Sequence, residues 1–311
     1  MSVNNYFEKN ADPESALMTV GLTKSYGKVQ ALRGVDLQVQ RGEIFGFLGP
    51  NGAGKTTTIR CLLDMIRPDS GEARVLGIDP QANPTAVQAR SGYLPGELEL
   101  IGNLTVERQL KFLNDMRGQK ADWEYIRQLC TRLGLDLKQP IKNLSKGNKQ
   151  KVGVLQAMMH KPELLLLDEP TSGLDPLIQQ EVLGLIREAR SEGATVFFSS
   201  HVLSEVEAVT DRVAIIRQGK IVEVGETSSL TQRAMHRVTV RFLEKVDFRN
   251  LGNLPGVNII SHGDSTSVDL QVVGAMDGLV KALGAYPVNE METSRPSLEE
   301  VFLAYYKKEI N

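Results

Sequence analysis

The segment GPNGAGKTT has the residue types of a site for the phosphates of a nucleotide. Its glycines let the backbone curl so that successive N–H groups point at one anion, next to the positive end of a helix dipole. Lys55 adds a full charge, and the Thr56 hydroxyl is a ligand that Mg²⁺ accepts. The residues predicted to line the phosphates are Gly49, Pro50, Asn51, Gly52, Ala53, Gly54, Lys55, Thr56 and Thr57.

A second group of reactive residues follows apolar runs further along the chain. LLLLDEP ends in Asp168, which can hold Mg²⁺ through water, and Glu169, which is placed to polarise an attacking water. His201 directly follows ATVFFSS. Acidic residues at a strand end are often only solvated, and a lone histidine there is more often structural. The phosphate loop upstream favours the catalytic interpretation, because ligands collect where parallel strands end.

These residues require a mostly parallel sheet to bring them to one edge. EIFGFLG, ELLLLD and ATVFFSS are near-continuous apolar runs, typical of strands buried on both faces, and helical segments alternate with them between residues 16 and 225. The segment MTVGLTKSYGKVQALRGVDLQVQRG alternates instead and predicts an antiparallel pair. Helical periodicity between Leu104 and Asn143 predicts an inserted helical subdomain.

The pattern changes near residue 229, which we take as a domain boundary. The order strand, helix, strand, strand, helix, strand predicts a small α+β, ferredoxin-like unit, followed by a final helix SLEEVFLAYYKK. The predicted organisation is a tail at 1–15, a nucleotide-binding domain at 16–228 with its helical subdomain at about 97–160, and an accessory domain at 229–311.

Composition narrows the classes of partner. A net charge of -2 gives no basic footprint, so no nucleic-acid partner is expected. Cys61 and Cys130 lack metal-ligand spacing and are interpreted as core residues in a reduced compartment. The N-terminus does not have the pattern of a secretory signal, and no apolar run reaches the roughly 18 residues that span a bilayer. The chain is therefore expected to be soluble by itself.

Two further segments have a simple structural interpretation. In LSKGNKQKV, Ser145 is a good N-cap for a solvated helix, although Ser145, Gly147 and the helix start also suit an anion. In TSGLDP, Asp175 can cap the helix that begins at Pro176.

The order of GPNGAGKTT, LSKGN, LLLLDEP, SGLDP and His201 resembles the nucleotide-binding subunit of ABC transporters over roughly residues 17–225. The resemblance implies a P-loop NTPase fold with antiparallel β and helical subdomains, and hydrolysis of ATP with Mg²⁺. It also implies that two such subunits, either identical or related, close head to tail around two nucleotides. They would drive a separate integral membrane permease from the cytoplasmic face of the membrane.

The resemblance also implies roles for individual residues. Lys55 and Thr56 would serve phosphate and Mg²⁺, Asp168 the metal, Glu169 the attacking water and His201 the γ-phosphate. Ser145, Gly147 and Asn148 would contact the phosphate held by the partner copy, Asp175 would couple the two sites, and Tyr26 would stack on adenine. For Tyr26, ordinary packing is the alternative.

The chain departs from the family pattern at two places. The usual LSGGQ is LSKGN here, with Lys146 and Asn148 replacing glycine and glutamine. In GYLPGELEL, Gly96 stands where the family has a glutamine that contacts Mg²⁺ and water. Glu97 is a candidate to reach the metal instead, or it is a solvated loop residue.

The C-terminal segment PSLEEVFLAYY is similar to extensions of exporter subunits of the drug, antibiotic and lipid class, so export is expected. The accessory domain is interpreted as a regulatory domain, a dimer brace or a passive appendage. The alternative function is a soluble ABC-type ATPase acting on the ribosome or on DNA. A P-loop kinase is a third candidate, but it would leave LSKGN and SGLDP without a role.

Overall fold

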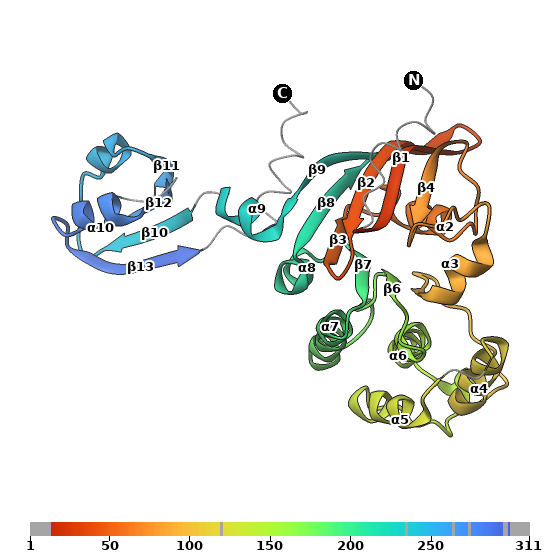
Figure 1. The fold of residues 1–311 in the computed structure, drawn as a ribbon. Coiled ribbons are helices and arrows are strands. Elements are labelled where there is room, and N and C mark those ends of the chain that lie inside the picture. The colour runs from red at the N-terminus through yellow and green to blue at the C-terminus, as the bar shows by residue number, and fades with distance from the viewer. Residues whose placement is uncertain are drawn as a thin grey trace. The chain divides into compact units, whose positions relative to one another are not determined.

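The computed structural model describes residues 14–118, 121–233, 236–262, 265–272, 275–294 and 298. The chain divides into two compact units, Met1–Gly225 and Glu226–Asn311, and the second is the blue end of the colour range (Figure 1). Residues 1–13 of the predicted tail and all of the predicted final helix except Leu298 lie outside the described residues.

The first unit is built on a six-stranded sheet of spatial order β5-β6-β7-β3-β8-β9. These strands are β3 (Ile44–Leu48), β5 (Ser91–Leu94), β6 (Leu164–Asp168), β7 (Thr195–Ser200), β8 (Arg212–Arg217) and β9 (Lys220–Glu226). All residues of β3, β6 and β7 are buried, and the three strands pair in parallel, which confirms the fold class expected from the apolar runs. In register, Leu48 faces Ser200 and Asp168 faces Ser199. The residues that follow these strands therefore lie next to one another at one edge of the sheet.

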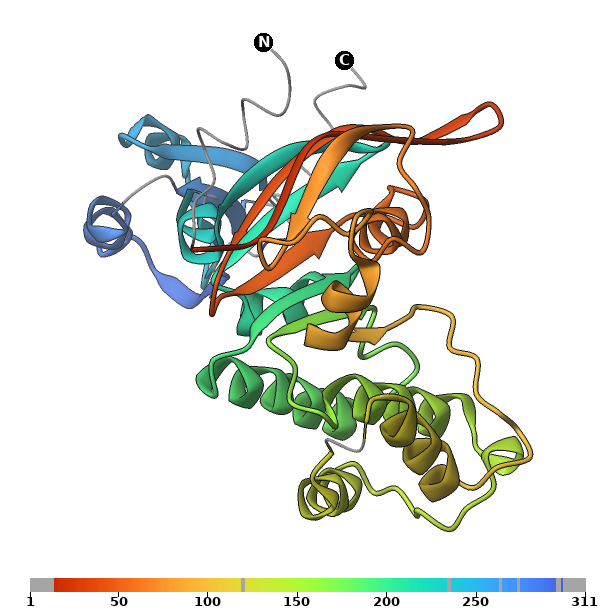
Figure 2. The ribbon, with the colours of Figure 1, turned by 45° about the vertical axis from the view of Figure 1, so that its right-hand side comes forward.

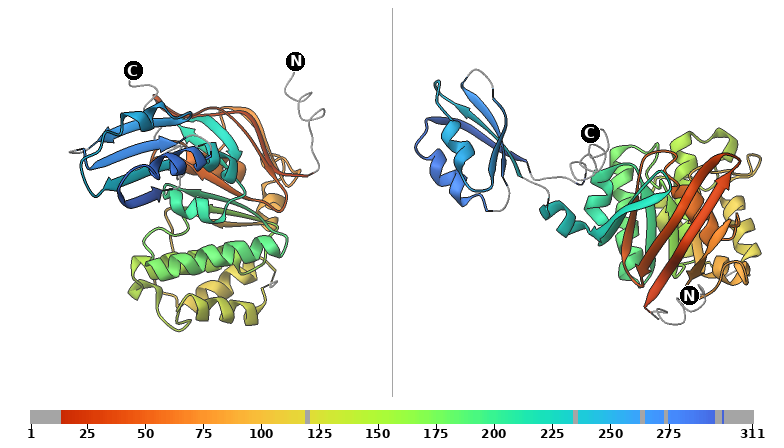
Figure 3. Two further views of the ribbon diagram at one scale, coloured as in Figure 1. Left: turned by 90° about the vertical axis from the view of Figure 1, so that its left-hand side faces the viewer. Right: turned by 90° about the horizontal axis from the view of Figure 1, so that it is seen from above.

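A three-stranded antiparallel sheet covers one face of the parallel sheet. It consists of β1 (Ser15–Tyr26), β2 (Val29–Gln40) and β4 (Ser70–Val75), and Figure 3 shows the long pair β1 and β2. Helix α2 (Lys55–Leu62) contributes to the same apolar core as both sheets. Phe197 of β7 belongs to that core, with its ring centroid 5.9 Å from that of Phe45 and 5.2 Å from that of Phe47. This core fixes the start of α2 against the end of β3.

The remaining helices of the first unit lie between the strands in the sequence. They are α3 (Pro84–Arg90), α4 (Val106–Met116), α5 (Trp123–Arg132), α6 (Lys146–Met158), α7 (Pro176–Ser191) and α8 (Leu203–Val209), with a 3-10 turn η1 (Ile141–Asn143). Helices α4 and α5 pack against α6 (Figure 2), and α6 in turn contacts β5 and β6. Within the described part of the chain, no helix has the length and apolar character needed to cross a membrane.

The second unit contains α9 (Thr227–Arg233), β10 (His236–Phe242), η2 (Arg249–Asn253), β11 (Val257–His262), β12 (Ser267–Val272), α10 (Asp277–Leu283) and β13 (Val288–Ser294). Its antiparallel sheet has the order β11-β12-β10-β13. The first helix predicted here is only the short 3-10 turn η2, because Gly252 weakens a helix and Pro255 ends it. The ferredoxin-like assignment of this unit stays a prediction.

Candidate functional site

The phosphate loop connects β3 to α2 and needs glycine at two positions. A Cβ on Gly49 would lie 2.4 Å from the carbonyl oxygen of Ile216. Gly54 caps α2 with φ 114°, and a Cβ there would lie 2.7 Å from the carbonyl oxygen of Ala31. A larger residue at either position would displace the backbone. The loop therefore leads directly into the first turn of α2, whose N–H groups are available to an anion.

Lys55 is the first residue of α2, and its side chain is only 6% exposed. Its Nζ donates to the carbonyl oxygens of Gly49, at 2.6 Å, and Pro50, at 3.4 Å. The same ammonium forms an ion pair with Glu169 Oε1 at 3.2 Å. The cation is thus held above the loop by backbone oxygens and one carboxylate.

Asp168 lies beside the loop and is 1% exposed. Its Oδ2 accepts a hydrogen bond of 2.5 Å from Thr56 Oγ1, and its Oδ1 accepts one from the Ser199 hydroxyl. Thr56 and Asp168 are thus brought together, as the sequence predicted for a pair that holds Mg²⁺. A hydroxyl and a carboxylate are hard oxygen donors that suit this ion. Among the described residues no three His, Cys, Asp or Glu side chains gather around a metal position.

Glu169 follows β6 in a left-handed backbone conformation, with φ 53°. Such a conformation costs a non-glycine residue on the order of 1 kcal/mol, and here the N–H of Glu169 donates to Ser199 O at 3.1 Å. The side chain meets His201, whose Nδ1 lies 2.7 Å from Glu169 Oε2. A base that is itself held by a second group is the arrangement expected for a residue that activates water.

Helix α6 begins at the segment LSKGN. Ser145 is its N-cap, because the Asn148 N–H donates to the Ser145 hydroxyl at 3.2 Å, and Ser145 is exposed. A Cβ on Gly147 would lie 2.8 Å from Gly173 O, so this glycine also has a packing role within the chain. Both interpretations of the segment, helix cap and anion site, are compatible with this geometry.

Sequence reasoning missed Gln150, a buried amide on α6. Its Nε2 donates to the carbonyl oxygens of Glu169, at 2.9 Å, and Pro170, at 3.2 Å. Helix α6 is therefore bonded to the backbone that carries the proposed base. Ser199 was also missed. Neither has a sequence signal, because each role depends on which strand or loop lies alongside.

The other predicted residues are placed as follows. Asp175 caps α7 by accepting the Ile178 N–H at 3.1 Å. Tyr26 ends β1 and is 48% exposed, which leaves ring surface for stacking. A Cβ on Gly96 would lie 3.0 Å from Asp168 Oδ2, so the position predicted for a metal-contacting glutamine does lie next to Asp168. Glu97 is exposed.

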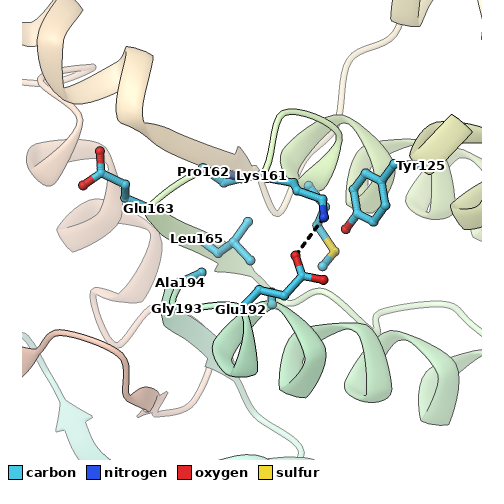
Figure 4. A pocket seen from close by; sticks show the side chains of 10 residues that line it. Tyr125, Lys161, Pro162, Glu163, Leu165, Glu192, Gly193 and Ala194 are labelled. Atoms are coloured by element: carbon cyan, nitrogen blue, oxygen red, sulfur yellow. Dashed lines mark hydrogen bonds and ion pairs between the residues drawn. The ribbon is translucent and has the colours of Figure 1, made fainter. Parts of the chain in front are cut away.

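A cavity of about 190 Å³ lies away from these residues, where β6 and β7 begin (Figure 4). Lys161 and Glu192 pair across it at 2.9 Å, and Lys161 Nζ lies 4.6 Å from the centroid of the Tyr125 ring. None of the predicted site residues lines this cavity. The predicted site residues lie instead at the opposite edge of the sheet, where those strands end.

Comparisons with known proteins agree with this assignment. The family model described as ABC transporter matches residues 32–172. Linearmycin resistance ATP-binding protein LnrL of Bacillus subtilis is 31% identical, over 92% of this chain and 97% of its own length. Daunorubicin/doxorubicin resistance ATP-binding protein DrrA of Streptomyces peucetius is 32% identical over 95% and 93%. Bacitracin transport ATP-binding protein BcrA of Bacillus licheniformis is 39% identical over 67% and 68%.

Solved structures give the same result for the fold. An ATP-binding subunit of an ABC transporter is 30% identical, with a TM-score of 0.64 over 70% of this chain and 92% of that one. A dimeric cassette bound to ADP and Pi has a TM-score of 0.62 at 21% identity, over 68% and 98%. Together with the phosphate loop and the carboxylates beside it, these similarities show that the chain belongs to the ATP-binding subunits of ABC transporters and is an ATPase.

Proposed function

We propose that this chain powers an exporter, with two copies, or one copy and a related subunit, closing around two Mg-ATP to drive a separate membrane-spanning subunit. The observation that carries the proposal is the cluster of Lys55, Thr56, Asp168, Glu169 and His201 at one edge of the sheet, with Ser145 left exposed at the tip of α6. The names of LnrL, DrrA and BcrA, which mention resistance or transport of antibiotics, support the choice of export.

The chain's own residues suggest how hydrolysis proceeds. Thr56 and Asp168 would hold Mg²⁺, which neutralises phosphate charge when it is bound. Lys55 would exchange its carbonyl partners for phosphate oxygens, and Glu169 would accept a proton from the attacking water. His201 holds the Glu169 carboxylate and, by family resemblance, faces the γ-phosphate. Most of the rate enhancement would come from positioning and electrostatics.

The second copy would complete each site through its exposed α6 tip. Ser145, Gly147 and Asn148 begin a helix of 13 residues, whose N-terminal N–H groups and dipole attract an anion. Asp175 starts α7 on the other side of Gly173, the residue against which Gly147 packs. This arrangement supports the proposal that Asp175 links the two sites, while Tyr26 offers an exposed ring to adenine.

We propose that the membrane subunit contacts the loop around Glu97 and the helices between Leu104 and Asn143. Large apolar side chains are exposed there: Ile101 is 41% exposed, Phe112 47% and Met116 71%. Apolar side chains exposed in one region are typical of an interaction surface.

The test is purification of the tagged full-length chain from the membrane fraction of cells that produce it. We expect one integral membrane protein to be recovered with it, and its crosslinks to map to residues 97–143. Recovery with ribosomes or DNA, and without any integral membrane protein, would favour the alternative soluble ATPase. Crosslinks found only outside 97–143 would contradict the proposed contact surface while leaving the membrane partner intact.

A further inference from the structure

Glu205 is a buried carboxylate to which the mechanism above gives no role. It lies in the first turn of α8 and is only 7% exposed. Among the described residues no lysine, arginine or histidine forms an ion pair with it. A buried carboxylate without a cation is costly unless hydrogen bonds satisfy it. The partners of Glu205 should therefore explain why it is there.

Two hydroxyl groups supply those hydrogen bonds. Thr171 Oγ1 donates to Glu205 Oε2 at 2.6 Å, and Ser200 Oγ donates to the same oxygen at 3.3 Å. Thr171 is 2% exposed and Ser200 is fully buried. Glu205 thus joins the loop after β6 to the end of β7 inside the protein.

The two donors are close in sequence to the residues that meet at the surface of the site. Thr171 lies two positions after Glu169, and Ser200 directly precedes His201. Glu169 Oε2 and His201 Nδ1 lie 2.7 Å apart. The two chain segments are therefore joined twice, at the surface by the Glu169–His201 contact and inside the protein by the hydrogen bonds of Glu205. The buried hydrogen bonds should limit how far Glu169 and His201 can move apart.

We propose that Glu205 is a positioning residue that sets the contact between His201 and Glu169 and thereby controls the rate of hydrolysis. The inference depends on the roles proposed for Glu169 and His201. Because Glu205 is buried behind the loops, its loss should affect turnover more than binding of ATP. A displacement of about 1 Å at a catalytic group can cost on the order of a hundredfold in rate.

A simple helix-capping role makes a different prediction. Glu205 is the third residue of α8, where a glutamate can bond back to the N-cap N–H. In this chain the N–H of the N-cap residue, Val202, donates instead to Ser200 Oγ at 2.9 Å. A residue that acted only on helix stability would affect hydrolysis equally whether or not His201 is present.

The test measures hydrolysis by the purified full-length chain in single turnovers with radiolabelled ATP, so that slow variants remain measurable. We expect Glu205→Ala to lower the rate about ten- to hundredfold with less than about a twofold change in KM for ATP. Glu205→Gln should keep most of the rate, because its amide oxygen still accepts from Thr171. When His201→Ala is already present, adding Glu205→Ala should lower the rate of hydrolysis by less than about a further twofold.

Glu207→Gln, an exposed change on the same helix, is the matched control and should retain the wild-type rate. Equal losses from Glu205→Ala with and without His201, or a rise in KM that matches the loss in rate, would overturn the inference. If Glu205→Ala does not fold, Thr171→Val removes one hydroxyl and Thr171→Ser restores it, and the same comparison applies. Absence of hydrolysis by the wild-type chain would instead count against the proposed catalytic roles.

Discussion

The phosphate loop and the tip of α6 differ in burial and in how many partners their side chains have within one chain. At the loop, Lys55 and Asp168 are buried and bonded to neighbours from other elements. At the tip, Ser145 is exposed, and its hydroxyl accepts from the N–H of Asn148 in its own helix. This difference supports the proposal that one copy assembles the binding and catalytic groups and that its α6 tip serves a second copy.

The two regions are nevertheless connected within the chain. Gln150, one turn along α6 from its tip, bonds to Glu169 O, and Gly147 packs against Gly173 O. A phosphate that binds at the tip would therefore act on a helix attached to the backbone of the proposed base. The two regions thus differ in exposure and in the partners of their side chains, but contacts to backbone oxygens connect them.

The largest expected effect is on the catalytic side of this comparison. Glu169→Gln should lower ATP hydrolysis by about 10² to 10⁴, because a positioned base contributes that much to the rate. ATP binding should persist, because Lys55, Thr56 and the loop are unchanged. Hydrolysis assays measure the loss of rate, and light scattering should show a dimer when ATP is bound. The control is Glu192→Gln at the distant cavity, and wild-type turnover in the Glu169 variant would exclude it as the base.

Mixing variants tests whether the α6 tip serves another copy. Lys55→Ala should impair ATP binding at the phosphate loop of the chain that carries it. Ser145→Arg should instead block the site at the phosphate loop of the partner copy. Each variant alone should be inactive as a homodimer, whereas a 1:1 mixture should recover about a quarter of wild-type hydrolysis, because half of the dimers then hold one intact site. Mixtures with no recovered activity would mean that Ser145 does not complete a partner's site.

A smaller effect is expected from adding a side chain at Gly96, which lies next to the buried carboxylate of Asp168. In Gly96→Ala the new Cβ would lie 3.0 Å from Asp168 Oδ2, which Thr56 already holds at 2.5 Å. The carboxylate must shift by a few tenths of an ångström, so the Mg²⁺ concentration for half-maximal hydrolysis should rise roughly three- to tenfold. A titration with Mg²⁺ at saturating ATP measures it. Glu97→Gln in the same titration shows whether Glu97 contributes to the metal site.

The smallest effect concerns the buried end of α6. Burial, with a contribution from Arg117, lowers the pKa of His160 from 6.5 to about 4, and its Nε2 contacts Ser91 O at 3.2 Å. Between these pKa values the unfolded chain binds more protons than the folded one, so stability falls as the pH falls from about 7 to 5. For a half-buried ring this loss should be roughly 1 kcal/mol.

Urea denaturation at pH 7 and pH 5 measures this loss. His160→Gln should lose less stability than the wild type on acidification, because it removes the buried ring that takes up the proton. Equal losses in wild type and His160→Gln would show that the ring does not stay neutral in the folded chain.

Parts of the fold followed from local sequence patterns. The three apolar runs became the fully buried strands β3, β6 and β7, because a segment apolar on both faces must be covered on both. The phosphate loop was predictable for a similar reason, since its glycines, lysine and threonine lie within nine residues. The first helix predicted in the second unit was wrong, because Gly252 and Pro255 within that segment leave only the short 3-10 turn η2.

By itself, the sequence determined the identity of the groups that can bind phosphate and Mg²⁺, and the sheet edge at which they should meet. Only the tertiary structure decided which partners these groups and their neighbours have: Ser199 on Asp168, Gln150 on the Glu169 backbone, and Thr171 on Glu205. The physical reason is distance along the chain. A loop's hydrogen bonds are set by neighbours in sequence, whereas these contacts join residues 19 to 34 positions apart and depend on how strands and helices pack.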